Sequence, residues 1–298
     1  MAESFSDYLV IAVSSRALFD LELENGIFEN EGLQAYRRYQ LEHQDVLLQP
    51  GVAFGLVRKI LALNLRSELS RAVEVVIVSR NNAECALRIS NSLDHYQLPI
   101  TRSAWTSGTP LSRYLDAFGV DLFLSADPAD VQAAINSGIA AARILPDVLQ
   151  QVPSDSPEIR IAFDGDAVLF SDESERVYQE QGLDAFLEHE KSNARRPLPD
   201  GPFARLFRNL AQIQAEFPAE SQPIRTAMVT ARSSPAHERV IRTFAAWGVR
   251  IDEAFFLGGM SKQAIIGAFQ PDLYFDDQDV HCAASSGVAP TGQVPWRQ

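Results

Sequence analysis

Residues that could carry out phosphoryl transfer follow short apolar runs in the second half of the chain. Asp164 and Asp166 come directly after one such run, and Thr230 follows another. The pair Asp276-Asp277 follows a third. If these runs are strands of one sheet, the acids converge at its edge and repel each other strongly unless a cation lies among them. Oxygen ligands of this kind suit Mg²⁺ better than zinc, so the pattern predicts a Mg²⁺ site.

A hydroxyl and an ammonium group near these acids would bind a phosphate. Thr230 can donate a hydrogen bond, and Lys262 supplies a point charge. Together with the metal they would neutralise charge on a transferring phosphoryl group. The carboxylate of Asp164 could attack phosphorus to form an aspartyl-phosphate. Asp166 could act as general acid to the leaving oxygen and then as general base for water.

Each of these signals is weak when taken alone. An Asp-Gly-Asp sequence is usually a turn, and a threonine after a strand is usually a helix N-cap. An acidic pair is usually part of a solvated loop. Because all of them occur in order, each after an apolar run, we interpret the chain as a Mg²⁺-dependent phosphatase with Asp164 as its nucleophile.

The elements that position these residues alternate between apolar strands and amphipathic helices. Residues 236–247, for example, place Val240, Phe244 and Trp247 at helical spacing. Strands that alternate with helices predict an α/β fold with a parallel sheet covered on both faces. In such sheets ligands bind beyond the carboxyl ends of the strands, where the candidate residues lie.

The two halves of the chain follow one plan. The apolar run 8–13 resembles residues 159–163, about 150 positions later, and residues 75–79 resemble residues 226–230 at nearly the same offset. A colinear series of such matches predicts a duplication. We expect a first domain over residues 1–150 and a catalytic domain over 151–298, with a linker near residues 145–157.

The first half lacks the acids of the second. At the positions that match Asp164 and Asp166 it has Ser14 and Arg16, so we expect neither a nucleophile nor a metal site there. This half could be a scaffold, an interface, part of the substrate pocket or a regulatory site. The regulatory alternative is a site for an anion, built from four strand-end residues: Ser14, Ser15, Arg16 and Ser79.

The composition excludes several classes of protein. The chain has 298 residues, 46% of them hydrophobic, and a net charge of −13, which argues against a nucleic-acid-binding surface. It has no apolar stretch of the roughly 20 residues that a membrane span requires. The acidic N-terminus does not resemble a signal peptide. The two cysteines, Cys85 and Cys282, are expected to be free thiols of a cytoplasmic protein.

The ordered residues resemble the four motifs of the haloacid dehalogenase superfamily, which are Asp-x-Asp, Thr/Ser, Lys and an acidic pair. Longer strings resemble the cytosolic 5′-nucleotidase type I family more narrowly. The resemblance covers essentially the whole chain, and the strings that carry it are residues 162–173, 229–233, 256–259 and 275–278 in the second half and 10–20 and 38–43 in the first.

This resemblance implies a fold of two haloacid-dehalogenase-like, Rossmannoid halves, and hydrolysis of nucleoside 5′-monophosphates, with AMP the leading candidate. It implies that Asp164 is the nucleophile and Asp166 the acid/base. The residues implied to bind phosphate are Thr230 and Lys262, with Gly165, Ala231 and Arg232 beside them. The implied Mg²⁺ ligands are Asp164, the backbone carbonyl of Asp166, and Asp276 or Asp277.

Phosphatases of this superfamily commonly insert a cap between the first two motifs, which predicts a small cap at about residues 172–217. Within it Phe186, Phe203 and Phe207 could stack on a base, although aromatic residues at helical spacing are more often core. Arg195-Arg196 could contact the phosphate or lie in a solvated loop. Two alternative functions remain open, a phosphatase for sugar phosphates or other small monoesters, and a non-catalytic nucleotide sensor. A homo-oligomer is compatible with the size of the chain.

Overall fold

The computed structural model describes residues 5, 8–66, 68–69, 72–146 and 156–296. The chain divides into two compact units. Unit 1 comprises Met1–Ser67 and Arg71–Ile144, and unit 2 comprises Glu68–Ser70 and Leu145–Gln298. The linker predicted near residues 145–157, and with it the predicted boundary between residues 150 and 151, lies largely outside the described residues.

Unit 1 contains a parallel sheet with the strand order β3-β2-β1-β4-β5. Its central strand, β1, is buried along its whole length, as expected for an apolar strand covered on both faces. The strands are β1 (Leu9–Val13), β2 (Val73–Ser79), β3 (Arg102–Trp105), β4 (Leu122–Ser125) and β5 (Ala140–Ile144). The helices are α1 (Ser15–Leu18), α2 (Glu22–Glu31), α3 (Leu33–Glu42), α4 (Phe54–Ala62), α5 (Ala86–His95), α6 (Ser112–Ala117) and α7 (Pro128–Asn136).

Unit 2 contains a parallel sheet with the order β8-β7-β6-β9-β10. Counted from the first strand of each unit, this is the order found in unit 1, and the predicted α/β architecture with parallel strands is confirmed. The strands are β6 (Ile159–Phe163), β7 (Ile224–Thr230), β8 (Glu253–Phe256), β9 (Leu273–Asp276) and β10 (Thr291–Gln293). The helices are α8 (Glu173–Ser192), α9 (Ala204–Ala215), α10 (His237–Trp247), α11 (Gln263–Phe269) and α12 (Asp279–Ser285).

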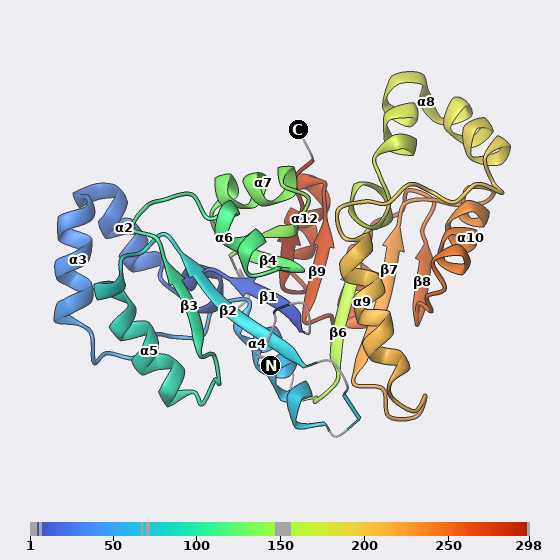
Figure 1. Cartoon of the computed structure of the whole chain (residues 1–298). Coiled ribbons are helices and arrows are strands. Elements are labelled where there is room, and N and C mark those ends of the chain that lie inside the picture. The colour runs from blue at the N-terminus through green and yellow to red at the C-terminus, as the bar shows by residue number, and fades with distance from the viewer. Residues whose placement is uncertain (1–4, 6–7, 67, 70–71, 147–155, 297–298) are drawn as a thin grey trace. The chain divides into compact units, whose positions relative to one another are not determined.

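Helix α8 lies beyond the carboxyl ends of β7 and β8 (Figure 1). It is interrupted at Gly182, whose φ of 82° is a left-handed conformation that glycine adopts without strain. In unit 1, Gly32 has the same φ of 82° and separates α2 from α3. The segment between the first two strands of each unit therefore contains two helical pieces that meet at a glycine.

The core of unit 2 is built from aromatic side chains on both the sheet and α9. The Phe163 ring packs edge-on against Phe207, with centroids 5.6 Å apart, and is stacked with Phe275 at 5.5 Å. Phe203 lies 4.7 Å from Phe275. Phe203 and Phe207 are fully buried, so the core role, the commoner one for aromatic residues at helical spacing, is confirmed and the alternative of stacking on a base is wrong. Since α9 packs on the sheet in this way, a cap would be confined to α8.

Among the described residues, no helix is both long enough and apolar enough to cross a membrane. Both cysteines are buried and free, as expected.

Candidate active site

The candidate nucleophile, Asp164, lies at the carboxyl end of the central strand β6. Its backbone N–H donates to the carbonyl of Phe275 on β9 at 2.7 Å, which continues the sheet up to the acid. The chain then turns through Gly165–Leu169, where Ala167 has a left-handed φ of 59°. Strands β7 and β9 flank β6 and end at Thr230 and Asp276. The topology thus places all three strand ends at one edge of the sheet.

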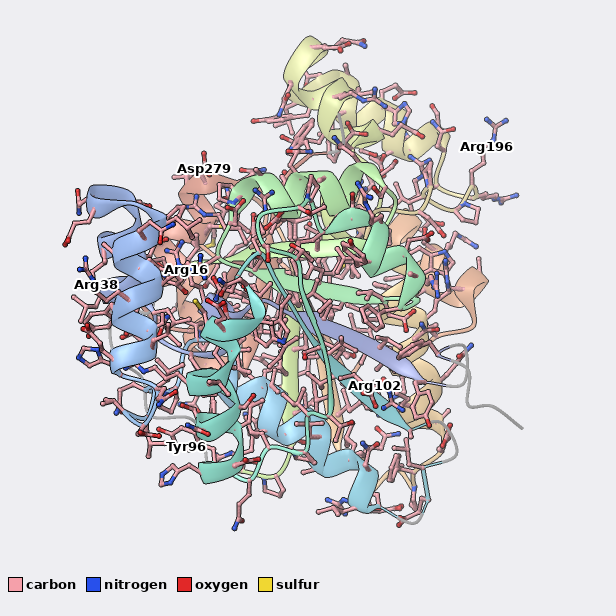
Figure 2. The ribbon with its side chains drawn as sticks, turned by 60° about the vertical axis from the view of Figure 1, so that its left-hand side comes forward. Arg16, Arg38, Tyr96, Arg102, Arg196 and Asp279 are labelled. Carbon is pink, nitrogen blue, oxygen red and sulfur yellow. The ribbon has the colours of Figure 1, made fainter. Side chains whose placement is uncertain are left out.

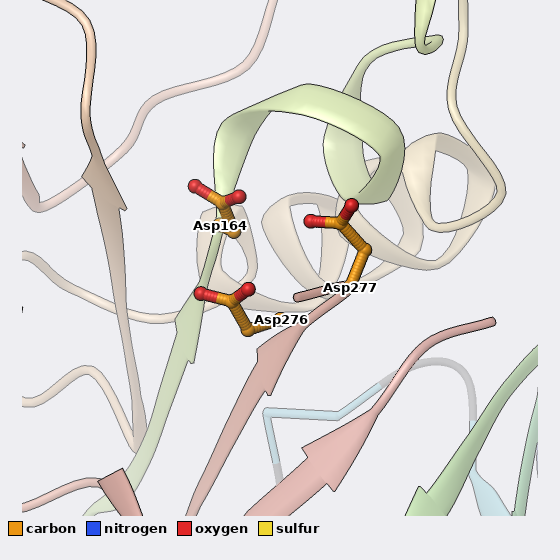
Figure 3. Close-up of side chains that lie close together, drawn as sticks. All are labelled: Asp164, Asp276 and Asp277. Atoms are coloured by element: carbon orange, nitrogen blue, oxygen red, sulfur yellow. The ribbon is translucent and has the colours of Figure 1, made fainter. Parts of the chain in front are cut away.

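Three buried carboxylates cluster at this edge. Ligand oxygens of Asp164, Asp276 and Asp277 all lie within 4.8 Å of one another, and each residue is at most 7% exposed. Figure 3 shows Asp164 at the end of its strand, close to Asp276 at the end of β9 and to Asp277, the next residue. Three of the four residues predicted to hold the metal are therefore brought together. A set of hard oxygen donors is the chemistry that Mg²⁺ prefers.

A buried lysine compensates part of this charge. The ammonium of Lys262 lies 2.8 Å from Oδ1 of Asp164 and 2.7 Å from Oδ2 of Asp276. Lys262 is 3% exposed and immediately precedes α11. Burial disfavours its charge, but the two carboxylates outweigh burial and raise the pKa of Lys262 above its usual value. This site therefore holds a charged lysine beside the candidate nucleophile.

One lysine does not compensate three acids, and their pKa values diverge. Burial and the charge of Asp276 raise the pKa of Asp164 to about 7, against the opposing effect of Lys262. Burial and the charges of Asp164 and Asp276 raise the pKa of Asp277 to about 8. Burial also acts to raise the pKa of Asp276, but Lys262, the His281 ring 3.5 Å away and a hydrogen bond from Tyr274 hold it at about 2. Without a further cation, the three carboxylates cannot all be ionised near neutral pH, so this donor set fits a divalent ion.

Asp166 points to a different partner. Its carboxylate receives two hydrogen bonds from Arg232, from Nε at 2.8 Å and from Nη2 at 2.6 Å. The remaining terminal nitrogen of Arg232 donates to Glu190 on α8. Arg232 was predicted to lie beside a phosphate; the structure gives it two carboxylate partners, and contact with phosphate stays a prediction.

The other predicted phosphate-binding residues surround the start of the turn. Thr230 is buried, and its Oγ1 accepts the backbone N–H of Arg232 at 3.2 Å. An accepting hydroxyl can still donate its own hydrogen. A Cβ on Gly165 would lie 3.4 Å from that same Oγ1, so the first two motifs are in contact. Ala231 is exposed beside them, and its carbonyl accepts the N–H of Gly259 at 3.0 Å.

The four strand-end residues of unit 1 divide into two groups. Ser15 and Ser79 share a hydrogen bond between their hydroxyls at 3.2 Å, and Ser14 caps α1 by accepting the N–H of Ala17. Arg16 instead contacts α2, where its Nη2 lies 2.8 Å from Glu22. The anion site predicted from these residues stays a prediction.

The arginine pair predicted to meet phosphate lies in an exposed loop. Arg195 and Arg196 are both exposed, and the side chain of Arg196 projects outward (Figure 2). The backbone carbonyl of Arg196 accepts a hydrogen bond from Nε of Arg239 at 3.0 Å. These observations favour the solvated-loop alternative for the pair.

Three residues of the site were not anticipated from the sequence. The hydroxyl of Tyr274 donates to Oδ2 of Asp276, and the indole of Trp296 donates to Asp277 at 2.7 Å. The third is the buried Glu190. Tyr274 could have been found, since residues two apart on a strand share a face. Trp296 and Glu190 reach the site from distant parts of the chain and leave no local signal.

The chain resembles known proteins over most or all of its length. The family model of 5′-nucleotidases matches residues 1–298. Human cytosolic 5′-nucleotidase 1B is 38% identical over 283 residues, which are 92% of this chain and 46% of that protein. The chain thus spans less than half the length of this curated relative. No solved structure matches the chain significantly. The full-length family match and this identity show that the chain belongs to the 5′-nucleotidase family.

Proposed function

We propose that the chain hydrolyses nucleoside 5′-monophosphates, with AMP the leading candidate, in a Mg²⁺-dependent reaction through an aspartyl-phosphate. The observation that carries the proposal is the cluster of buried Asp164, Asp276 and Asp277 around Lys262 at one sheet edge. The family and the printed name of the human relative support the substrate class, and that name also supports a cytosolic location.

Asp164 attacks phosphorus, and the bond between phosphorus and the 5′ oxygen breaks as the new bond forms. Asp166 gives its proton to the departing oxygen and later takes a proton from the water that cleaves the aspartyl-phosphate. Lys262 and Thr230 stabilise negative charge on the phosphoryl oxygens. Bound Mg²⁺, held by Asp164, the carbonyl of Asp166 and Asp276 or Asp277, would supply further charge neutralisation there.

We infer that the two units descend from a duplication and that α8 is the small cap of the catalytic unit. The shared strand order and the matching glycines, Gly32 and Gly182, support the duplication. The half-buried Phe186 of α8 lies with its ring centroid 5.5 Å from the Arg232 guanidinium, which supports a role for this helix beside the substrate.

The test is phosphate release from a panel of nucleoside and sugar monophosphates, with and without Mg²⁺, by the wild type and by Asp164→Asn. We expect Mg²⁺-dependent release from nucleotides that Asp164→Asn abolishes. Robust turnover by Asp164→Asn would rule out the mechanism. Release from sugar phosphates alone would support the mechanism but contradict the proposal that nucleotides are the substrates. Nucleotide binding without any release would favour the sensor alternative.

A further inference from the structure

Glu190 is a fully buried acid near the end of α8, and the mechanism above does not use it. Its Oε1 accepts hydrogen bonds from Nη1 of Arg239 at 2.9 Å and from the hydroxyl of Ser174 at 2.7 Å. Its Oε2 accepts a hydrogen bond from Arg232. Glu190 is 0% exposed, and Arg232 and Arg239 are each 3% exposed. One carboxylate therefore forms ion pairs with two buried guanidinium groups.

Unit 1 also contains a buried arginine paired with an acid, but this acid occupies a different position in the sequence of the unit. There Arg88, which matches Arg239, pairs with Glu24 at 2.5 Å. Glu24 matches Ser174, and Gln40 stands at the position of Glu190. Gln40 lies 3.4 Å from the same nitrogen of Arg88. Arg239 also has a carboxylate at the start of the helical segment, Glu173 at 3.3 Å. Both units thus give the buried arginine of α5 or α10 an acid from the start of that segment, and only unit 2 adds a buried acid near its end.

The position of the acid differs between the two units because the residue at the position of Arg232 differs. Unit 1 has Asn81 there, and its side chain accepts a hydrogen bond from the hydroxyl of Tyr36. Asn81 is neutral and needs no carboxylate. Unit 2 has a buried arginine, and Glu190 is the acid that reaches both this arginine and Arg239. The placement of the acid at 190 rather than at 174 is therefore explained by Arg232 and not by Arg239.

We propose that Glu190 is a positioning residue for proton transfer in the reaction proposed above. Arg232 uses Nε and Nη2 to hold Asp166, and Glu190 takes the third direction of the same planar group. Because a guanidinium is rigid, fixing Nη1 fixes the fork that orients the Asp166 carboxyl. While Asp166 carries the proton for the leaving oxygen, Glu190 still compensates the buried Arg232. Helix α8 thereby sets the position of the acid without contacting the reacting atoms.

A charge exchange within unit 2 tests this role and preserves the partner of Arg239. The double variant Ser174→Glu/Glu190→Gln recreates the arrangement of unit 1. Arg239 keeps Glu173 and has a second acid at position 174, whereas Arg232 keeps only Asp166. The single variant Glu190→Gln removes both pairings. Glu188→Gln, at an exposed position of α8, is the matched control for loss of charge from this helix.

The readout is kcat/KM with Mg²⁺ for a nucleoside 5′-monophosphate and for its analogue with sulfur at the bridging 5′ position. A thiolate leaves without a proton, so the sulfur ester does not need the general acid. For the double variant we expect a loss of about 100-fold on the oxygen ester, within the range that general acid catalysis supplies, and only a small loss on the sulfur ester. A melting temperature of the double variant above the assay temperature shows that it is folded in the assay, and the activity of Glu188→Gln should stay near wild type.

Parallel losses on both esters would overturn the proposal, because they would mean that Glu190 supports only the structure of the site. Unchanged kcat/KM for the double variant would overturn it as well, because Glu190 would then serve only Arg239. A wild type that releases phosphate from neither ester would instead refute the proposed function, so the two failures are distinguishable.

Discussion

The ammonium of Lys262 lies 2.8 Å from the carboxylate of Asp164, and both groups are buried at the carboxyl edge of the sheet. The same ammonium contacts Asp276 at 2.7 Å. A nucleophilic carboxylate must stay ionised although burial favours its neutral form. The lysine offsets part of that cost, and a divalent ion among the three acids would offset the rest.

Replacing Lys262 with methionine should destabilise the metal-free protein. The substitution keeps the apolar volume but leaves Asp164 and Asp276 without their shared cation. Removing one partner of a buried ion pair costs about 3–5 kcal/mol, and protonation of an acid would recover part of it. Urea unfolding should show this loss near neutral pH, and saturating Mg²⁺ should reduce it. Lys191→Met, at an exposed position of α8, should have little effect. Equal stability of the two variants would contradict the argument.

Mg²⁺ binding should depend on pH through the two acids with raised pKa values. Asp164 and Asp277, with pKa values of about 7 and about 8, must lose their protons to bind the ion. The affinity for Mg²⁺ should therefore rise as the pH rises through these values and level off above about 8. Calorimetry in buffers of different ionisation enthalpy should record proton release that is largest below about pH 7 and disappears at alkaline pH. Binding without proton release at the lower pH would contradict the pKa values.

The raised pKa values of Asp164 and Asp277 also predict how the stability of the metal-free protein changes with pH. Because their pKa values are higher in the folded protein than in the unfolded chain, the folded form binds more protons between about pH 4 and 8. The free energy of unfolding of the metal-free protein should therefore fall as the pH rises through this window. Mg²⁺ should oppose the fall, since it binds the ionised carboxylates. A free energy of unfolding of the metal-free protein that rises across the same window would show that other groups dominate.

The sequence predicted the sheet and the meeting of the acids because both depend on local patterns. Buried parallel strands read as continuous apolar runs, and their carboxyl ends meet at one edge, so Asp164 and Asp276 could be placed together. Phe203 and Phe207 could be assigned to the core only as the commoner alternative, because helical spacing alone does not tell which side of a helix meets the sheet. Their contacts with Phe163 and Phe275 needed the tertiary structure.

The partners of the charged residues could not be predicted for a related reason. Arg232 was expected beside a phosphate because it follows Thr230, but its nearest acids are Asp166 and Glu190, which lie 66 and 42 positions away in the sequence. A long side chain can pair with any opposite charge that the fold brings within its reach. Only Asp166 lies in a recognisable motif, so Glu190 left no signal.

Thr230 should contribute to phosphate binding through its hydroxyl. Thr230→Val removes the hydrogen-bonding group and keeps the shape, whereas Thr230→Ser keeps the group. A hydrogen bond to a charged acceptor contributes about 1.5–3 kcal/mol, which corresponds to a loss of roughly 10- to 100-fold in kcat/KM for Thr230→Val. Thr230→Ser should stay close to wild type. Steady-state kinetics on a nucleoside monophosphate provide the comparison. A similar loss in both variants would mean that packing of the threonine methyl group, and not its hydroxyl, is what the site needs.

Gly201 should be required for the turn that follows the nucleophile. A Cβ at this position would lie 2.3 Å from the carbonyl oxygen of Phe170 and 2.5 Å from that of Val168, which are rigid backbone atoms. The N–H of Gly201 also donates to the carbonyl of Leu169 at 2.9 Å. Gly201→Ala must therefore push the two backbone segments apart, and such overpacking costs about 1–3 kcal/mol.

The turn that Gly201→Ala displaces begins at Gly165, so the variant should also lose activity. Gly26→Ala is the matched control, because Gly26 lies within α2 and an added Cβ meets nothing within 4 Å. That substitution should leave activity unchanged and stabilise the protein by roughly 0.5–1 kcal/mol, since alanine is the better helix former. Urea unfolding and phosphate release should be measured on both variants. A Gly201→Ala protein with the stability and activity of the wild type would show that the two segments can separate without disturbing Asp164.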